Sequence, residues 1–114
     1  MILLVALALT SMQPRLANVG DCGWVHGQYV EANGSFVHRI FVRGTGRVLY
    51  VDIPDEGDDA TPKPLARYFD SGQFQPQRDQ ILGDFYVCAR KRRSTGDMQP
   101  VELKRVRHVR VLTY

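Results

Sequence analysis

The feature that most constrains the fold of this chain is the alternation of apolar and polar residues in five separate stretches. Side chains of a β-strand point to opposite faces in turn, so this spacing indicates strands that bury one face. Val25 and Tyr29 would share a face in the first stretch, and Phe85 and Val87 in the fourth. Asn33-Gly34, between the first two stretches, is typical of a tight hairpin turn. The expected strands are 23–32, 35–44, 47–54, 83–90 and 101–111.

One segment between the third and fourth stretches has a helical spacing instead. Leu65, Tyr68 and Phe69 are three and four residues apart, which places them on one side of a short helix. Gly72 follows as a stop signal. The sequence therefore predicts a helix between the third and fourth strands.

The order of these elements predicts the fold class. Three strands, one short helix and two strands within a 114-residue chain are the element order of an OB-fold. We therefore expect a single all-β domain with one short helix, spanning 21–114, folded as a five-stranded OB-fold-like Greek-key barrel. An antiparallel sandwich is the alternative. Val106 is out of step with the apolar residues around it, which predicts a β-bulge within 104–107.

The N-terminus begins with an uninterrupted apolar run, residues 2–9, which is too short to cross a bilayer as a helix. Such a run is typical of a secretory signal, with cleavage near Ala17. We expect residues 1–20 to be a signal segment and the mature chain to have no membrane span. A buried N-terminal strand or helix is the alternative.

The chain has two cysteines, Cys22 and Cys88. An even number of cysteines behind an export signal favours a disulfide bond. We therefore predict one structural bond between them and a periplasmic or secreted protein. Two free thiols in a cytosolic protein is the alternative.

Four segments carry a resemblance to a known family. The stretches "C..VHGQYV", "GRVLYVDIP", "LGDFYVCA" and "GDMQPVELKRVRHV" together resemble small exported bacterial OB-fold domains of uncharacterised function. The resemblance covers residues 22–111 and is carried by glycines and alternating apolar positions. It implies an exported barrel, and it implies no catalytic residues that could be transferred.

The last two expected strands are basic. Eight of the 15 lysines and arginines lie within 83–111, against three acids, although the net charge of +3 is too small to indicate a polyanion partner by itself. A cationic groove with aromatic rings that stack on bases is how OB-folds bind single-stranded nucleic acid. The alternative, which we favour, is that this basic ribbon is the solvated outside of the barrel. The candidate ligand-binding residues are Trp24, Tyr29, Tyr50, Tyr86, Arg90, Arg92, Lys104 and Arg107.

Patterns for catalysis or metal binding are weak. The acids of segment 52–59 could hold a hard cation such as Ca²⁺, but they have no EF-hand spacing, and a solvated acidic loop is the interpretation we favour. The segment also has a faint similarity to metal-dependent nucleases of the OB-fold type, which would use Asp52 at a metal site. His26 and His38 could face each other across the first hairpin, but a metal would need a third ligand. No serine lies in a nucleophile motif.

These observations together predict a non-enzymatic binding or accessory protein of the bacterial envelope, without a cofactor. Its expected ligand is a protein, peptide or glycan, bound on the open face of the first three strands and the loops near Asn33 and Gly96. Single-stranded nucleic acid is the first alternative, and the nuclease is the second.

Overall fold

The computed structural model describes residues 13–31, 38–53, 61–75 and 78–113. The predicted order of strands and helix is confirmed, whereas the Asn33-Gly34 turn, acidic residues 55–59 and the apolar run 2–9 lie outside the described residues. The elements are β1 (Cys22–Glu31), β2 (His38–Val42), β3 (Val48–Val51), the 3-10 turn η1 (Lys63–Leu65), α2 (Ala66–Asp70), β4 (Asp79–Ala89) and β5 (Gln99–Thr113).

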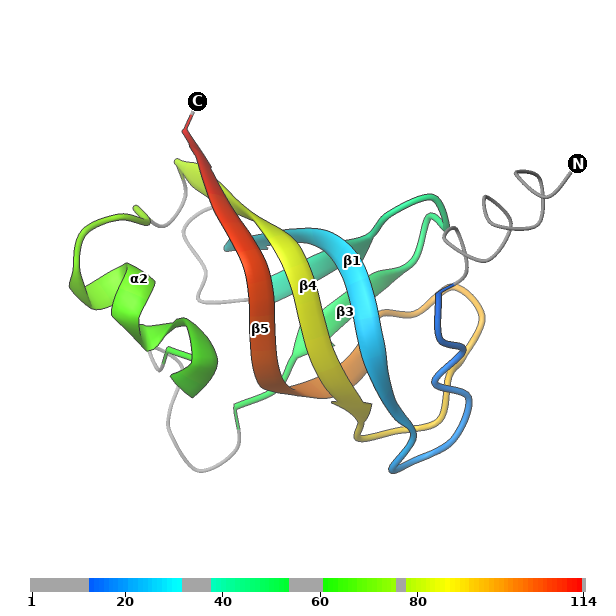
Figure 1. Ribbon diagram of the computed structural model, residues 1–114. Helices are drawn as coiled ribbons and strands as arrows, with labels where there is room; N and C mark the ends of the chain where they lie inside the picture. The colour runs from blue at the N-terminus through cyan, green and yellow to red at the C-terminus, as the bar shows by residue number, and fades with distance from the viewer. Residues whose placement is uncertain (1–12, 32–37, 54–60, 76–77, 114) are drawn as a thin grey trace, which may run out of the picture.

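The five strands close into a barrel in the order β1-β2-β3-β5-β4, with β4 returning to pair with β1 (Figure 1). Neighbouring strands are antiparallel except β3 and β5, which run parallel. A fourth strand that returns beside the first, after three strands in sequence, is a Greek key. The predicted class, all-β with one short helix and a five-stranded barrel, is confirmed.

Alternating side chains fill the interior of the barrel, as their spacing predicted. Tyr29 and Phe85 are among the largest wholly buried side chains, and every strand contributes to the same core. The strand members of this core are Val25, Tyr29, Ile40, Val42, Leu49, Val51, Ile81, Phe85, Val87, Ala89, Val101 and Leu103.

Two segments outside the strands complete the core from opposite sides of the barrel (Figure 1). On one side Leu65 of η1 is buried, and Phe69 and Phe74 pack edge-on against the ring of Tyr29. On the other side Leu16 is buried, and its carbonyl accepts a 2.7 Å hydrogen bond from the Gln99 side chain. The N-terminal segment 13–21 is therefore part of the folded unit of the uncleaved chain, whereas the cleavage expected near Ala17 would remove Leu16 from the core.

β5 has two irregularities that explain its broken alternation. The pairing with β4 skips one residue at Lys104, between the partners of Tyr86 and Val87. It skips another near His108, between the partners of Leu82 and Asp84. Each extra residue reverses which side chains face inward, so Val106 still packs on the core. The predicted bulge is confirmed at Lys104, and the second one lies just beyond the predicted range.

The predicted disulfide is confirmed. Cys22 and Cys88 are directly opposite each other in the β1–β4 pairing, with their Cα atoms 4.0 Å apart. A structural disulfide fits a protein that folds in an oxidising compartment. Over the described residues, none of the helices has the length and apolar character needed to cross a membrane.

We expect loss of the disulfide to be strongly destabilising. The bond closes a loop with a sequence separation of 66, and the chain-entropy model gives such a loop about 4 kcal/mol of stabilisation. The double variant C22A/C88A should lose about this free energy of unfolding in urea titrations. A reducing agent should weaken the wild type and leave the variant unchanged; equal stability of oxidised and reduced wild type would contradict the prediction.

We also expect the N-terminal segment to stabilise the barrel through Leu16. The variant Leu16→Ala should lower the free energy of unfolding by about 3 kcal/mol, because removing the buried side chain leaves a cavity in the core. Val19→Ala is the control, since Val19 is 62% exposed and its substitution should cost about 0.5 kcal/mol or less. Equal effects of the two substitutions in urea unfolding would show that Leu16 does not belong to the core.

Candidate functional site

Asp84 is a buried carboxylate on the outward face of β4. Its neighbour Phe85 points into the core, so Asp84 points away from it, yet the residue is only 4% exposed. The strand pairings place it opposite His26 of β1 and Arg107 of β5, whose side chains cover it. A buried charge needs partners, and these strands supply them.

Three basic side chains converge on this carboxylate, and we call the group the Asp84 cluster (Asp84, His26, Arg107 and His108). Arg107 donates from Nε to Oδ2 at 3.1 Å, and Nδ1 of His108 lies 2.8 Å from the same oxygen. Nδ1 of His26 contacts Oδ1. An ionised carboxylate only accepts hydrogen bonds, so each imidazole carries a proton on Nδ1 and turns Nε2 away from Asp84.

The second bulge of β5 is what brings both Arg107 and His108 to Asp84. Consecutive residues of a regular strand point to opposite faces. His108 has a positive φ of 55°, which is uncommon for a residue other than glycine, and it sits where the β4–β5 pairing skips a residue. The bulge therefore places two adjacent side chains on one face.

The contacts of Asp84 also keep it ionised. Burial by itself would raise the pKa of this carboxyl, but hydrogen bonds from His108 and Arg107 and the nearby His26 act in the opposite direction. The net pKa of Asp84 lies below its ordinary value. At neutral pH Asp84 is therefore ionised beside the fixed positive charge of Arg107.

Two arginines of β5 stack on aromatic rings beside the cluster, and we call this group the arginine–aromatic face (Trp24, Tyr86, Arg105 and Arg107). The guanidinium carbon of Arg107 lies 4.0 Å from the ring centroid of Trp24, and that of Arg105 lies 4.8 Å from Tyr86. The two rings are themselves 5.2 Å apart between centroids. These distances are in the range of cation–π interactions.

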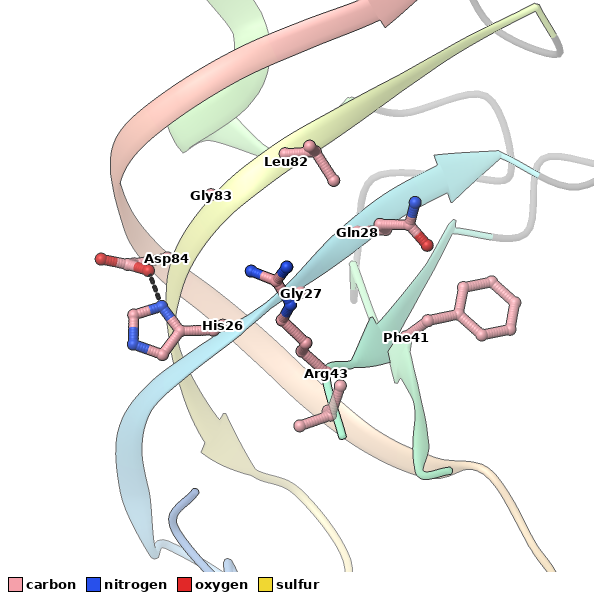
Figure 2. A pocket seen from close by; sticks show the side chains of 9 residues that line it. His26, Gly27, Gln28, Phe41, Arg43, Leu82, Gly83 and Asp84 are labelled. Carbon is pink, nitrogen blue, oxygen red and sulfur yellow. Dashed lines mark ion pairs between the residues drawn. The ribbon is translucent and has the colours of Figure 1, made fainter. Parts of the chain in front are cut away.

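A pocket of about 570 Å³ lies across the outer surface of β1, and we call it the β1 pocket. Gly27 and Gly83, which are paired in the β1–β4 register, contribute backbone to its lining. Figure 2 shows the guanidinium group of Arg43 extending over β1 at Gly27, and the ion pair of His26 with Asp84 at one side. The lining residues are His26, Gly27, Gln28, Phe41, Val42, Arg43, Leu82, Gly83 and Asp84.

Gly27 allows β1 and β2 to come together beneath this pocket. A Cβ atom at this position would lie 2.3 Å from the carbonyl oxygen of Phe41, a distance that no side chain can occupy. Any other residue at position 27 would push the two strands apart. Gly27 is therefore needed for the close approach of the β1 and β2 backbones.

The structure brings together three of the residues predicted to bind a ligand, namely Trp24, Tyr86 and Arg107. The prediction of Tyr29 as a surface ring is wrong, because Tyr29 is wholly buried and its hydroxyl contacts Nδ1 of His38. Burial raises the pKa of this hydroxyl well above its ordinary value.

The other predicted residues lie apart from this group. Arg90 forms ion pairs with Asp52 at 3.3 Å and Glu102 at 3.7 Å, and Lys104 pairs with Glu102 at 3.2 Å. Tyr50 lies on β3, and Arg92 is an exposed residue between β4 and β5. These residues belong to the solvated outside of the barrel.

His26 and His38, which could have faced each other across the first hairpin, do not do so. The β1–β2 register places His38 opposite Glu31, at the far end of the hairpin from His26. His26 instead faces Asp84. In the part of the chain that the structure describes, no group of three or more His, Cys, Asp or Glu side chains could hold a metal ion.

Sequence reasoning missed Asp84, Arg105 and His108 as members of a site. The out-of-step Val106 was a signal for them, because a break in alternation marks a bulge that changes the direction of its neighbours. An acid at an outward strand position was not a signal, since most such acids are solvated.

We expect Asp84→Asn to show how the contribution of the Asp84 cluster to the free energy of unfolding depends on pH. At neutral pH the variant should lose about 2 kcal/mol of unfolding free energy, because several hydrogen bonds lose a charged acceptor. The folded pKa of Asp84 lies below the ordinary 3.8, so its stabilisation is fully present above that pH and is lost as pH falls through the folded pKa. The stability difference between wild type and variant in urea should therefore shrink below about pH 4. A difference that persisted or grew in acid would contradict this assignment.

Comparison with known proteins adds no family to this geometry. No family model, no curated protein and no solved structure matches the chain. The OB-fold assignment and the resemblance to exported bacterial domains therefore stay predictions, and the described site geometry is the basis on which a function can be proposed.

Proposed function

We propose that this protein is a non-enzymatic binding module with an OB-fold-like barrel, exported to the bacterial periplasm or secreted. The disulfide supports an oxidising compartment, and the apolar run 2–9 supports an export signal. Its ligand is an acidic partner chain, peptide or glycan, which lies along the arginine–aromatic face. The observation that carries this proposal is the stacking of Arg105 and Arg107 on Trp24 and Tyr86.

Stacked guanidinium groups are well suited to this role. A ring beneath each guanidinium restricts its motion, which reduces the entropy lost when an anion binds. Among the described residues, Arg105 has no ion pair, while Arg107 shares Asp84 with two histidines. The face therefore keeps positive charge for an anionic ligand.

Single-stranded nucleic acid is the second candidate, favoured by the presence of two aromatic rings on a cationic surface. A base that stacked on Trp24 would have to displace the guanidinium group of Arg107, which lies 4.0 Å above that ring. This cost is absent for a ligand that only needs anionic groups beside the arginines. For that reason we prefer the acidic peptide or glycan.

The nuclease alternative has less support. Asp52, which it needs as a metal ligand, is paired with Arg90 in the described part of the chain. The acidic residues 55–59, which such a site would also use, lie outside the described residues.

We expect the double variant R105A/R107A to lose binding of acidic polymers. Trp24 is the single tryptophan of the chain, so its fluorescence reports directly on this face. Probes would be a sulfated glycan, a polyglutamate peptide and an oligothymidylate, each at about 50 mM and about 200 mM salt. The preferred ligand should bind the wild type at low salt and lose about tenfold or more in affinity with the double variant.

Lys104→Ala is the matched control for this experiment. It removes one positive charge from the same strand, but Lys104 is paired with Glu102 and does not stack on a ring. Its effect on affinity should be small. The proposal fails if none of the probes binds at low salt, or if Lys104→Ala is as damaging as the double variant. Tightest binding of the oligothymidylate would select nucleic acid instead.

A further inference from the structure

The β1 pocket is large enough to hold a ligand separate from the arginine–aromatic face. Its volume of about 570 Å³ falls within the range of pockets that bind small molecules. It is lined by residues of β1, β2 and β4 and by Arg43, whereas Arg105 and Arg107 lie on β5 and do not line it. His26 and Asp84 are shared between the wall of the pocket and the Asp84 cluster.

One part of this pocket has cationic and hydrogen-bonding groups. Arg43 follows β2, and its backbone N–H donates to the His26 carbonyl at 2.9 Å, which fixes the base of its side chain beside β1. Among the described residues, no ion pair uses the guanidinium group of Arg43. The His26 ring is tied to Asp84 through Nδ1, and Figure 2 shows its other ring nitrogen on the side away from Arg43.

The negative charge in the wall does not cancel these groups. Asp84 on β4 is the acid that lines the pocket, and it is already shared by His26, by Arg107 and by His108. Gln28 is uncharged, and its amide nitrogen donates to Gln80 at 2.7 Å. The guanidinium group of Arg43 is therefore the cationic donor of the pocket wall that no ion pair among the described residues uses.

The remaining lining is apolar. Phe41 is 40% exposed and stands among the few large apolar side chains at the described surface. Leu82 lies on the β4 side, and Figure 2 shows Phe41 and Leu82 on different strands of the pocket. Covering an exposed phenyl ring and a leucine removes apolar area from water, which favours an apolar ligand body.

We propose that the β1 pocket binds a carboxylate attached to an apolar body. Arg43 takes the carboxylate through its two-pronged N–H edge, and the apolar body packs over Gln28 against Phe41 and Leu82, which flank Gln28 in the β1–β2 and β1–β4 pairings. A small apolar acid and the free C-terminus of a peptide ending in Leu or Phe share this chemistry. The inference rests on the proposed function as a binding module and adds a second, independent ligand subsite to it.

The test compares a free acid with its amide on the wild-type protein. The probes are a short neutral peptide ending in phenylalanine, the same peptide with a C-terminal amide, and 4-phenylbutyrate. Titration calorimetry should show that the free-acid peptide binds and that the amide is weaker by about tenfold or more, because the charge-assisted contact is missing. Binding of 4-phenylbutyrate alone would identify a small acid as the ligand, and binding of the free-acid peptide alone a chain terminus.

Two substitutions locate this binding in the pocket. Arg43→Ala should lower the affinity of the free acid about tenfold or more and leave the amide unchanged. Arg67→Ala is the matched control, since Arg67 is exposed on α2 and stacks on Tyr68, away from the lining of the pocket. The comparison of acid with amide needs no variant, so it stays decisive if Arg43→Ala folds poorly.

The outcomes separate this inference from the proposed function. Arg105 stacks on Trp24 and Tyr86 and, among the described residues, forms no ion pair with Asp84. The variant Arg105→Ala should therefore keep its affinity for the free acid while its affinity for acidic polymers falls. The inference is overturned if the free acid and the amide bind equally, or if neither binds at millimolar concentration. It is also overturned if a folded Arg43→Ala variant binds the free acid as tightly as the wild type. Loss of acid binding in Arg105→Ala with retention in Arg43→Ala would move the carboxylate to the arginine–aromatic face and also overturn the inference.

Discussion

The antiparallel pairing of β1 with β4 is the contact on which the rest of this structure depends. It runs in register from Cys22 opposite Cys88 to Tyr29 opposite Ile81. β2 and β3 extend the sheet from one side of β1, and β5 joins β3 to β4, so this pairing removes the last open edge and closes the barrel. The disulfide fixes one end of the pairing, which makes the closed state less costly in chain entropy.

The candidate site is a consequence of the same register. The pairing sets Asp84 opposite His26 and Gly83 opposite Gly27. The buried carboxylate and the glycines of the β1 pocket therefore belong to consecutive residue pairs of β1 and β4. A shift by one residue would turn Asp84 into the core and remove both features. Asp84 also links two surfaces, because His26 belongs to the pocket and Arg107 to the arginine–aromatic face.

Several features of the fold follow from local chemistry and were predictable. The alternation of apolar residues fixed the inward faces, the spacing of Leu65 and Phe69 indicated the short helix, and Val106 indicated a bulge. Other features were not predictable. Phe74 and Leu16 are single apolar residues in irregular segments, so no periodicity marks them, yet both are buried in the core. Phe74 and Leu16 are core residues only because the folded chain places their segments over opposite sides of the barrel.

The sequence by itself determined the strands, the helix, the inward faces and the disulfide partners, because each depends on residue spacing or on having only two cysteines. Tertiary structure alone decided the site. The prediction that basic and aromatic residues would form one surface holds for Trp24, Tyr86 and Arg107, while Tyr29 is in the core and Arg90 is used in ion pairs. Which side chains meet across strands depends on register and on bulges, and these are set by the packing of the closed barrel as a whole. Local spacing carries no information about that choice.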